Sequence, residues 1–166
     1  MLFTIAIDSR EQQPFHFPED ACSVVRATLP TGDYAVAGDY GFAIERKSMT
    51  DFLGTVSTGW ARFRREIARA RKAGFTLPVI VEGSLTELFC SVDADGYIVA
   101  PDNEHPRLTA AFALRRIGQI QRLGGSVMMA ENPFVAAGIA FSILYQRARE
   151  LAIGTENYAN DPDRSV

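Results

Sequence analysis

The pattern of apolar and polar residues predicts strands and helices that alternate along most of the chain. Strands are predicted at runs of apolar residues, over 2–7, 22–28, 77–82 and 126–130. Helical spacing of apolar residues predicts a short helix or turn and three longer helices, over 50–56, 60–73, 107–123 and 132–152. This order indicates an α/β fold, with a three-layer α/β/α arrangement around a mixed central sheet.

Several predicted elements carry boundary signals. Gly74 and the pair Gly124-Gly125 end two of the helices, and Asn132-Pro133 supplies an N-cap and a favoured first residue for the last one. Ser84 and Glu87 form a capping box for a brief helix after the strand at 77–82. Residues 91–106 contain turn signals that fit a small hairpin, and no role is assigned to them.

A further hairpin is predicted where two short runs, 33–37 and 42–46, flank the turn sequence GDYG at 38–41. If the two strands pair symmetrically about the middle of this turn, Asp33 lies opposite Glu45. Directly opposed residues have Cβ atoms about 4.5 to 5.5 Å apart. Carboxylates at that distance repel each other unless a cation lies between them. The pairing therefore predicts a cation-binding pair of carboxylates.

Further polar residues gather near this pair. Lys47 shares a strand face with Glu45 because strand side chains alternate with period two, and Asp51 lies nearby if the chain turns into a helix. Asp8 and Glu11 leave the end of the first strand and can complete a second metal site. A hard cation on oxygen ligands polarises a phosphoryl group and activates water, while a lysine neutralises charge in the transition state. The cluster points to phosphodiester hydrolysis.

Four sequence segments carry a resemblance to a known family. Gly32-Asp33, Glu45-Arg46-Lys47 and Asp51 reproduce the GD-x(n)-ERK-x(3)-D signature of the XPF family of structure-specific endonucleases, and Asp8-Ser9-Arg10-Glu11 resembles the D-x-R-E segment that precedes it there. The resemblance implies a restriction-endonuclease-like core and dependence on Mg²⁺, for which Mn²⁺ can substitute. It also implies cleavage of branched or flapped DNA near junctions of single and double strands.

The resemblance also implies roles for individual residues. The implied catalytic residues are Asp33, Glu45, Arg46, Lys47 and Asp51. The implied metal ligands are Asp8, Asp33 and Glu45, with Arg10 and Glu11 in support. For Arg46 an alternative stays open. Strand alternation places it on the other face of the strand from Glu45 and Lys47, where it can be a structural partner of a carboxylate.

The helix over 60–73 carries a basic face, formed by Arg62, Arg65, Arg69 and Lys72. With a nuclease motif just upstream, this face is expected to contact DNA phosphates, and an ordinary solvated face is the alternative. Many members of the XPF family also carry a tandem helix-hairpin-helix module for binding DNA, and no such module is expected within these 166 residues. Substrate choice is therefore the least determined part of the expected function.

Composition narrows the picture only slightly. The 166 residues fit one domain, expected over 1–153 with a flexible tail over 154–166, and a net charge of −3 does not indicate a DNA-binding protein by itself. Cys22 and Cys90 lack metal-site spacing and predict reduced thiols in a cytosolic protein, or a nuclear one if the host is eukaryotic. The apolar stretch 134–145 is shorter than the roughly 20 residues of a membrane span.

The last predicted helix is apolar on nearly every side, which indicates burial on two faces. The XPF family pairs through C-terminal helices, so a homodimer or heterodimer is expected, with burial inside the domain as the alternative. The expected activity is Mg²⁺-dependent endonucleolytic cleavage of branched or flapped DNA. Two alternatives stay open, a non-catalytic DNA-binding or scaffold subunit and a restriction-type or Holliday-junction nuclease, which the Glu-x-Lys spacing also permits.

Overall fold

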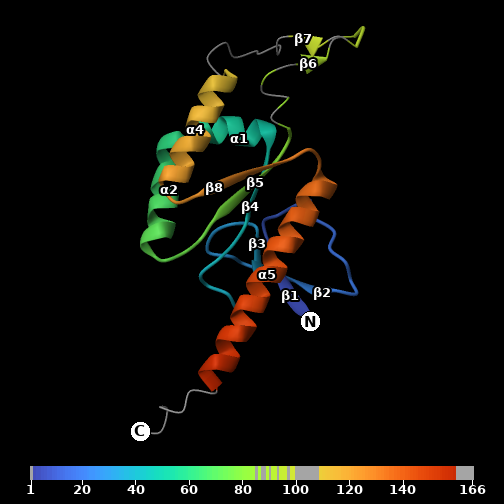
Figure 1. The fold of residues 1–166 in the computed structure, drawn as a ribbon, viewed down its shortest axis with the longest axis vertical. Coiled ribbons are helices and arrows are strands. Elements are labelled where there is room, and N and C mark those ends of the chain that lie inside the picture. The colour runs from blue at the N-terminus through green and yellow to red at the C-terminus, as the bar shows by residue number, and fades with distance from the viewer. Residues whose placement is uncertain are drawn as a thin grey trace.

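The structure is a computed structural model that describes residues 2–84, 86, 89, 91–92, 94–96, 98–99 and 109–159. Its strands are β1 (Phe3–Asp8), β2 (Cys22–Ala27), β3 (Tyr34–Val36), β4 (Glu45–Ser48), β5 (Pro78–Glu82), β6 (Ser91–Val92), β7 (Ile98–Val99) and β8 (Ser126–Ala130). Its helices are α1 (Met49–Val56), α2 (Trp60–Lys72), α4 (Ala110–Arg122) and α5 (Pro133–Ala159). Figure 1 shows α1, α2 and α4 grouped on one side of the strands and α5 on the other.

The strands of the central layer form two three-stranded groups with the orders β2-β1-β3 and β4-β5-β8. The first group is mixed, since β1 pairs parallel with β2 and antiparallel with β3. The second group is entirely parallel. One antiparallel bridge, between Tyr34 and Ile44, links the chain at β3 to the chain just before β4. The residues of the predicted catalytic motif lie where these two groups meet.

The predicted hairpin over 33–46 is wrong as a two-stranded ladder but right in register. The bridge between Tyr34 and Ile44 is symmetric about residue 39, as predicted. Beyond it the two segments separate, because β3 pairs with β1 and β4 pairs with β5. Longer-range strand partners thus replace the local pairing after a single step.

Two apolar cores explain the three layers. Val79 and Val81 of β5 pack with Phe52, Phe63 and Ile120, so α1, α2 and α4 cover one face. The opposite face carries Ile80, which belongs to a core that also contains Ala140 and Leu144 of α5, together with residues of β1 and β3. Val79, Ile80 and Val81 point alternately to the two faces of β5, so one face packs against α1, α2 and α4 and the other against α5. The α/β/α arrangement predicted from the sequence is therefore confirmed.

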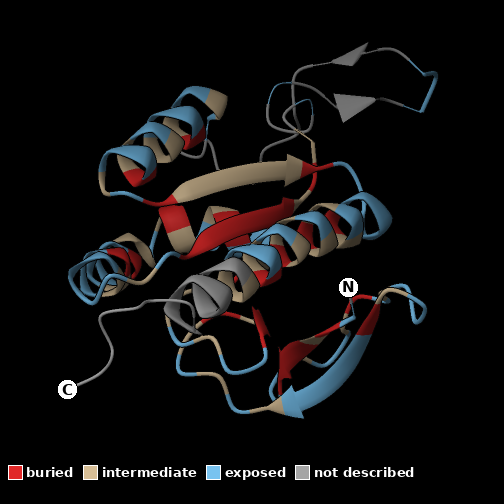
Figure 2. Cartoon of the chain, turned by 60° about the horizontal axis from the view of Figure 1, so that its bottom comes forward, coloured by how far each residue is buried: buried red, intermediate tan, exposed pale blue. Residues whose placement is uncertain are grey.

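Burial differs sharply between the middle and the edge of the central layer. Figure 2 shows β5 buried along most of its length, whereas β2 at the edge is largely exposed. The exposed positions of β2 include the apolar residues Val24 and Val25. β3 and β4, which lie next to Asp33 and carry Glu45, therefore pair with well-buried strands, β1 and β5 respectively.

Most predicted element boundaries are confirmed, with three corrections. The strand predicted over 42–46 is shifted to β4 (Glu45–Ser48), because its ladder with β5 begins at Glu45. Asn132 caps α5 through a hydrogen bond from the backbone N–H of Val135 at 2.9 Å. Thr109 is extended and accepts a hydrogen bond from the N–H of Phe112, so α4 begins at Ala110 and not at residue 107. α5 continues past residue 152 to Ala159 because one glycine, Gly154, is tolerated in a helix at a cost of about 1 kcal/mol.

Other expectations can be placed against the described residues. The hairpin expected within 91–106 is present as β6 and β7, which pair antiparallel. Residues 154–159, expected in a flexible tail, are helical, and residues 160–166 lie outside the described residues, as do Glu87 of the expected capping box and Cys90. In the described part of the chain, no helix is both long and apolar enough to span a bilayer.

The apolar surface of α5 is covered mainly by its own domain along its middle turns. Leu144 is fully buried, and the ring of Phe141 lies 5.9 Å from that of Phe3. Exposed positions along these turns are occupied by Gly138, Ser142 and other small or polar residues. Among the residues of this helix whose burial is described, 133–152, large apolar groups are exposed only toward the start, where Phe134 is 87% exposed. Internal burial thus accounts for much of the apolar pattern.

Candidate active site

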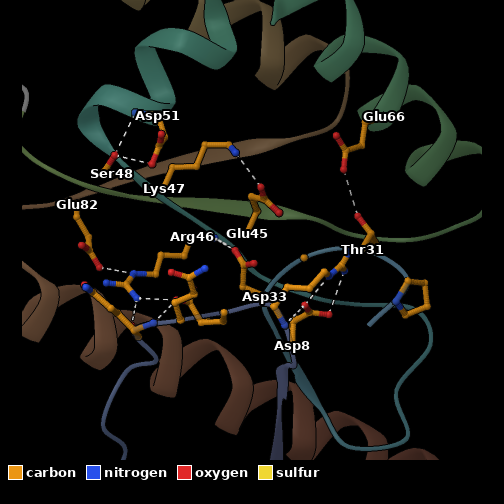
Figure 3. A pocket seen from close by; sticks show the side chains of 16 residues that line it. Asp8, Thr31, Asp33, Glu45, Arg46, Lys47, Ser48, Asp51, Glu66 and Glu82 are labelled. Carbon is orange, nitrogen blue, oxygen red and sulfur yellow. Dashed lines mark hydrogen bonds and ion pairs between the residues drawn. The ribbon is translucent and has the colours of Figure 1, made fainter. Parts of the chain in front are cut away.

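A polar cleft of about 630 Å³ lies where the two strand groups meet, and Figure 3 shows the side chains that line it. Seven carboxylates line it, those of Asp8, Glu11, Asp33, Glu45, Asp51, Glu66 and Glu82. Three cationic side chains accompany them, those of Arg10, Arg46 and Lys47. This excess of negative charge favours binding of a cation.

The Gly-Asp pair of the motif has a steric origin. Gly32 has a φ of +74°, and a Cβ atom there would lie 3.0 Å from the carbonyl oxygen of Ile44. The close approach lets the N–H of Asp33 donate to the same carbonyl at 2.7 Å. Together with the bridge between Tyr34 and Ile44, this bond places Asp33 beside Glu45. Glycine is therefore needed at position 32 to bring the two carboxylates together.

The carboxyl group of Asp33 is held in an environment that disfavours its charge. Burial raises the pKa of Asp33 to about 6, and the nearby carboxylates of Glu45 and Glu11 act in the same direction. A hydrogen bond from the backbone N–H of Arg46 at 2.7 Å and the charge of Lys47 oppose this rise. The repulsion predicted between Asp33 and Glu45 is thus a property of the folded chain.

Lys47 and Glu45 lie on one face of β4, as strand alternation predicts. The ammonium group of Lys47 donates to Glu45 Oε1 at 2.8 Å, and both side chains are mostly buried. Both project toward α1 and α2 in Figure 3. The pair presents a cation and a carboxylate to the same volume that Asp33 borders.

Asp51 is fixed at the start of α1. Its N–H donates to Ser48 Oγ at 3.0 Å, and the Ser48 hydroxyl donates to Asp51 Oδ2 at 2.7 Å. Ser48 is therefore the N-cap that turns the end of β4 into the helix, and the turn brings Asp51 to the cleft wall. The predicted proximity of Asp51 to the motif is explained by this cap.

Asp8 is buried and fully engaged with neighbouring donors. Arg10 donates through its Nε at 2.7 Å and its backbone N–H at 2.9 Å to Oδ1, while Arg10 Nη2 and the N–H of Leu29 donate to Oδ2 at 3.0 and 2.8 Å. The hydrogen bonds from the Arg10 side chain are the main cause that lowers the pKa of Asp8 to about 2. A metal-ligand role for Asp8 would require Arg10 to release at least one of these oxygens.

Arg46 lies on the opposite face of β4 from Glu45. Its Nε donates to Glu82 Oε1 at 2.6 Å, and its Nη1 lies 3.5 Å from Glu11 Oε1 and donates to the backbone carbonyl of Gln13. The guanidinium carbon lies 4.5 Å from the centre of the Phe15 ring. Arg46 thus ties the loop after β1 to the end of β5. This geometry supports the structural interpretation of Arg46.

Two cleft residues were missed by the sequence interpretation. Glu82 ends β5 and lies next to Ser48 in the register of β4 and β5, a position that its place at a strand end could have signalled. Glu66 projects from α2 into the cleft and accepts a hydrogen bond from the Thr31 hydroxyl at 3.4 Å. The sequence feature that could have indicated Glu66 is that it is a single acidic residue within a basic helix.

The predicted basic face of α2 is exposed but does not line the cleft. Arg62, Arg65, Arg69 and Lys72 are all exposed, and α2 contributes Glu66 alone to the cleft lining. Arg69 instead lines a neighbouring hollow. DNA contact by this face stays a prediction.

The residues of the cleft can be compared with the needs of a divalent cation. Among the described residues, no three histidine, cysteine, aspartate or glutamate side chains form a ready-made metal cluster. Mg²⁺ commonly uses only one or two carboxylates, with waters and substrate phosphates completing its coordination. The buried oxygen donors of Asp33 and Glu45, in a cleft with excess negative charge, fit that mode of binding.

Comparisons with known proteins give one family match and similarity to solved structures. The family model described as the ERCC4 domain matches residues 7–108. The fold is similar to that of XPF from Aeropyrum pernix, with a TM-score of 0.59 and 21% identity over 92% of this chain and 69% of that one. It is also similar to XPF from Aeropyrum pernix in complex with DNA, with a TM-score of 0.61 and 20% identity over 89% of this chain and 66% of that one. No curated protein matches the chain.

Replacing Asp33 by asparagine should stabilise the metal-free protein at neutral pH. The pKa of Asp33 is about 6 in the folded state against an ordinary 3.8, so ionisation costs the wild type stability as the pH rises through this window. Asparagine keeps an oxygen that accepts the hydrogen bond from Arg46. We expect a gain of up to about 3 kcal/mol in unfolding free energy above pH 7, falling to none below pH 4. Urea titrations across this range in EDTA measure it, and a pH-independent difference would contradict it.

Removing the charge of Arg46 should destabilise the fold more than removing an exposed arginine. Arg46→Met leaves Glu82 and Glu11 without their cation, and we expect a loss of about 1 to 3 kcal/mol in unfolding free energy. The double variant Arg46→Met/Glu82→Met should recover part of the loss, since it removes one uncompensated carboxylate. Urea denaturation measures both, with the exposed Arg149→Met as matched control. A single variant no less stable than this control would refute the structural role.

Proposed function

Because this chain belongs to the ERCC4 domain family, we propose that it is a DNA endonuclease that depends on Mg²⁺ and hydrolyses phosphodiester bonds in branched or flapped DNA. One observation carries the proposal. Asp33 and Glu45 are brought together by backbone register in an acidic cleft, with the ammonium group of Lys47 at 2.8 Å from Glu45. A strongly negative cleft repels a phosphodiester unless a cation is bound there. A cation held by these carboxylates would offset their negative charge and so allow the phosphodiester to enter the cleft.

The proposed roles follow from the positions of the side chains. Asp33 and Glu45 hold Mg²⁺, or Mn²⁺ in its place, and the chemistry that the ion supplies when bound is polarisation of the scissile phosphoryl group. Lys47 orients the attacking water and neutralises negative charge that develops on the phosphoryl oxygens. Asp51 borders the same volume and supports the attacking water by accepting a hydrogen bond.

The remaining motif residues act through these groups. Asp8 and Arg10 fasten the end of β1 to the segment before β3, which positions Asp33. Glu11 and Arg46 connect the loop after β1 to Glu82 at the end of β5. Asp8 becomes an additional ligand if DNA phosphates draw Arg10 away, which the 70% exposure of the Arg10 side chain permits.

DNA is the proposed substrate on two grounds. One of the similar structures is a complex of XPF from Aeropyrum pernix with DNA. The exposed basic face of α2, formed by Arg62, Arg65, Arg69 and Lys72, is proposed to contact the phosphate backbone beside the cleft.

Pairing with a second copy or a partner subunit through α5 is proposed as well, with the exposed Phe134 as part of the contact.

Two other functions compete with this proposal. A non-catalytic DNA-binding subunit would not need the buried carboxylate pair, whose repulsion is a cost to the fold. A restriction-type or Holliday-junction nuclease shares the Glu-x-Lys geometry and differs in the DNA that it cuts. A panel of flap, fork, bubble, four-way junction and plain duplex substrates separates the last of these from the main proposal.

Cleavage of a labelled flap substrate should require Mg²⁺, Asp33, Glu45 and Lys47. Asp33→Asn and Glu45→Gln each remove a ligand charge, and we expect losses of at least about a thousandfold in single-turnover rate. Lys47→Ala should lower that rate by about a hundredfold or more while changing DNA affinity little, since its proposed role is in the transition state.

The matched control is Glu131→Gln, which removes an exposed carboxylate outside the cleft lining. Near-normal cleavage by Glu45→Gln would remove the metal assignment. DNA binding by the wild type without cleavage of any substrate in the panel would favour the non-catalytic subunit.

A further inference from the structure

A second hollow of about 380 Å³ adjoins the active-site cleft and differs from it in chemistry. Its walls are largely apolar, and the aromatic rings of Tyr40, Phe42 and Phe75 contribute to them. The remaining lining comes from the segment after β2, from the turn between β3 and β4, and from one side of α2. The cleft, in contrast, is lined almost entirely by polar and charged groups.

The two hollows lie side by side and share part of their walls. Pro30, Thr31 and Glu66 line both of them. The hydrogen bond from the Thr31 hydroxyl to Glu66 at 3.4 Å lies at this boundary and is visible in Figure 3. A chain that passes over this boundary has one part in the charged cleft and the next part in the aromatic hollow. A nucleic-acid strand has that alternation of charged phosphate and apolar base face.

The charges around the aromatic hollow favour a base over a phosphate. Its carboxylates are Asp39 and Glu66, and its one cationic lining residue is the exposed Arg69. Asp39 is neutralised by Arg147, whose Nε lies 2.7 Å from Asp39 Oδ2. A phosphate inside the hollow would face Glu66 with only Arg69 to offset it, whereas the amino groups of a base can donate to a carboxylate.

Tyr40 is the most exposed large apolar side chain of this hollow, at 85%. The turn that carries it is held in place, because the N–H of Gly41 donates to Asp39 Oδ1 at 2.9 Å and Arg147 anchors the same carboxylate to α5. An exposed ring on an anchored turn offers a stacking surface at little cost in conformational entropy. Stacking on such rings is the common way in which proteins hold unpaired bases.

We propose that this aromatic hollow binds one unpaired nucleobase of the DNA strand whose phosphate lies in the active-site cleft, with Tyr40 as the stacking residue. The proposal rests on the proposed nuclease function and names the feature by which the chain selects DNA with a single-stranded segment beside the cleavage position. Fully paired DNA cannot fill the hollow without unstacking a base, so it forfeits this contact.

The test compares DNA affinity by fluorescence anisotropy with Ca²⁺ in place of Mg²⁺, so that a cation is available to the acidic cleft, and uses a flap substrate and a blunt duplex of equal length. Tyr40→Ala should weaken binding of the flap by about 5- to 150-fold, equivalent to about 1 to 3 kcal/mol at 1.4 kcal/mol per factor of ten, and should change duplex binding less than twofold. Tyr40→Trp should restore flap binding. Phe89→Ala, which removes another exposed ring that lines neither hollow, is the matched control and should have no effect on either DNA.

A second readout follows the base itself. A 2-aminopurine placed in the unpaired strand beside the cleavage position should lose fluorescence on binding to the wild type and keep it on binding to Tyr40→Ala. Equal weakening of flap and duplex by Tyr40→Ala, or unchanged binding of both, would overturn the proposal and leave the hollow to another occupant such as a protein segment. If the wild type binds neither DNA, this result contradicts the proposed nuclease function, and the proposed base-binding role of the hollow, which rests on that function, is contradicted with it.

Discussion

Repulsion between two carboxylates that the backbone brings together is the constraint on which the site depends. Asp33 and Glu45 are neighbours because the bridge between Tyr34 and Ile44 sets their register, and Gly32 permits the close approach that the bridge requires. Burial, with the repulsion from Glu45 acting in the same direction, raises the pKa of Asp33 to about 6. The fold thus carries an electrostatic cost that a bound cation would relieve, and the proposed catalysis uses the same arrangement.

The surrounding ion pairs hold this arrangement from two sides. Asp8 and Arg10 connect the end of β1 to the segment that leads to Asp33. Arg46 connects the loop after β1 to Glu82, on the face of β4 that points away from Glu45. The motif therefore divides by strand face, since Glu45 and Lys47 pair with each other on one face of β4, while Arg46 pairs with Glu82 and Glu11 on the other. A contiguous Glu-Arg-Lys sequence meets both needs because strand side chains alternate.

Local patterns predicted the elements and the register of the carboxylate pair, and long-range pairing decided the rest. The turn at 38–41 predicted that Asp33 and Glu45 would be opposed, but a turn cannot indicate that β3 leaves for β1 and β4 for β5. Glu82 was missed because it comes to the site through the parallel pairing of β4 and β5. The helix α5 extends further than predicted because residues 154–159 were expected to belong to a flexible terminal tail, whereas they continue the helix. The carboxylates and Lys47 alone pointed to phosphodiester hydrolysis, and the expectation of branched or flapped DNA as the substrate came from the motif resemblance.

The most direct test of the carboxylate pair is the effect of Mg²⁺ on thermal stability, measured without any DNA. If Asp33 and Glu45 hold the ion, millimolar Mg²⁺ should raise the Tm of the wild type by several degrees over a salt of equal ionic strength, because binding at a hundred times Kd is worth about 2.7 kcal/mol. The same addition should raise the Tm of Glu45→Gln little or not at all, and that of Glu131→Gln as much as that of the wild type. An equal rise in Glu45→Gln, or no rise in the wild type, would contradict the account.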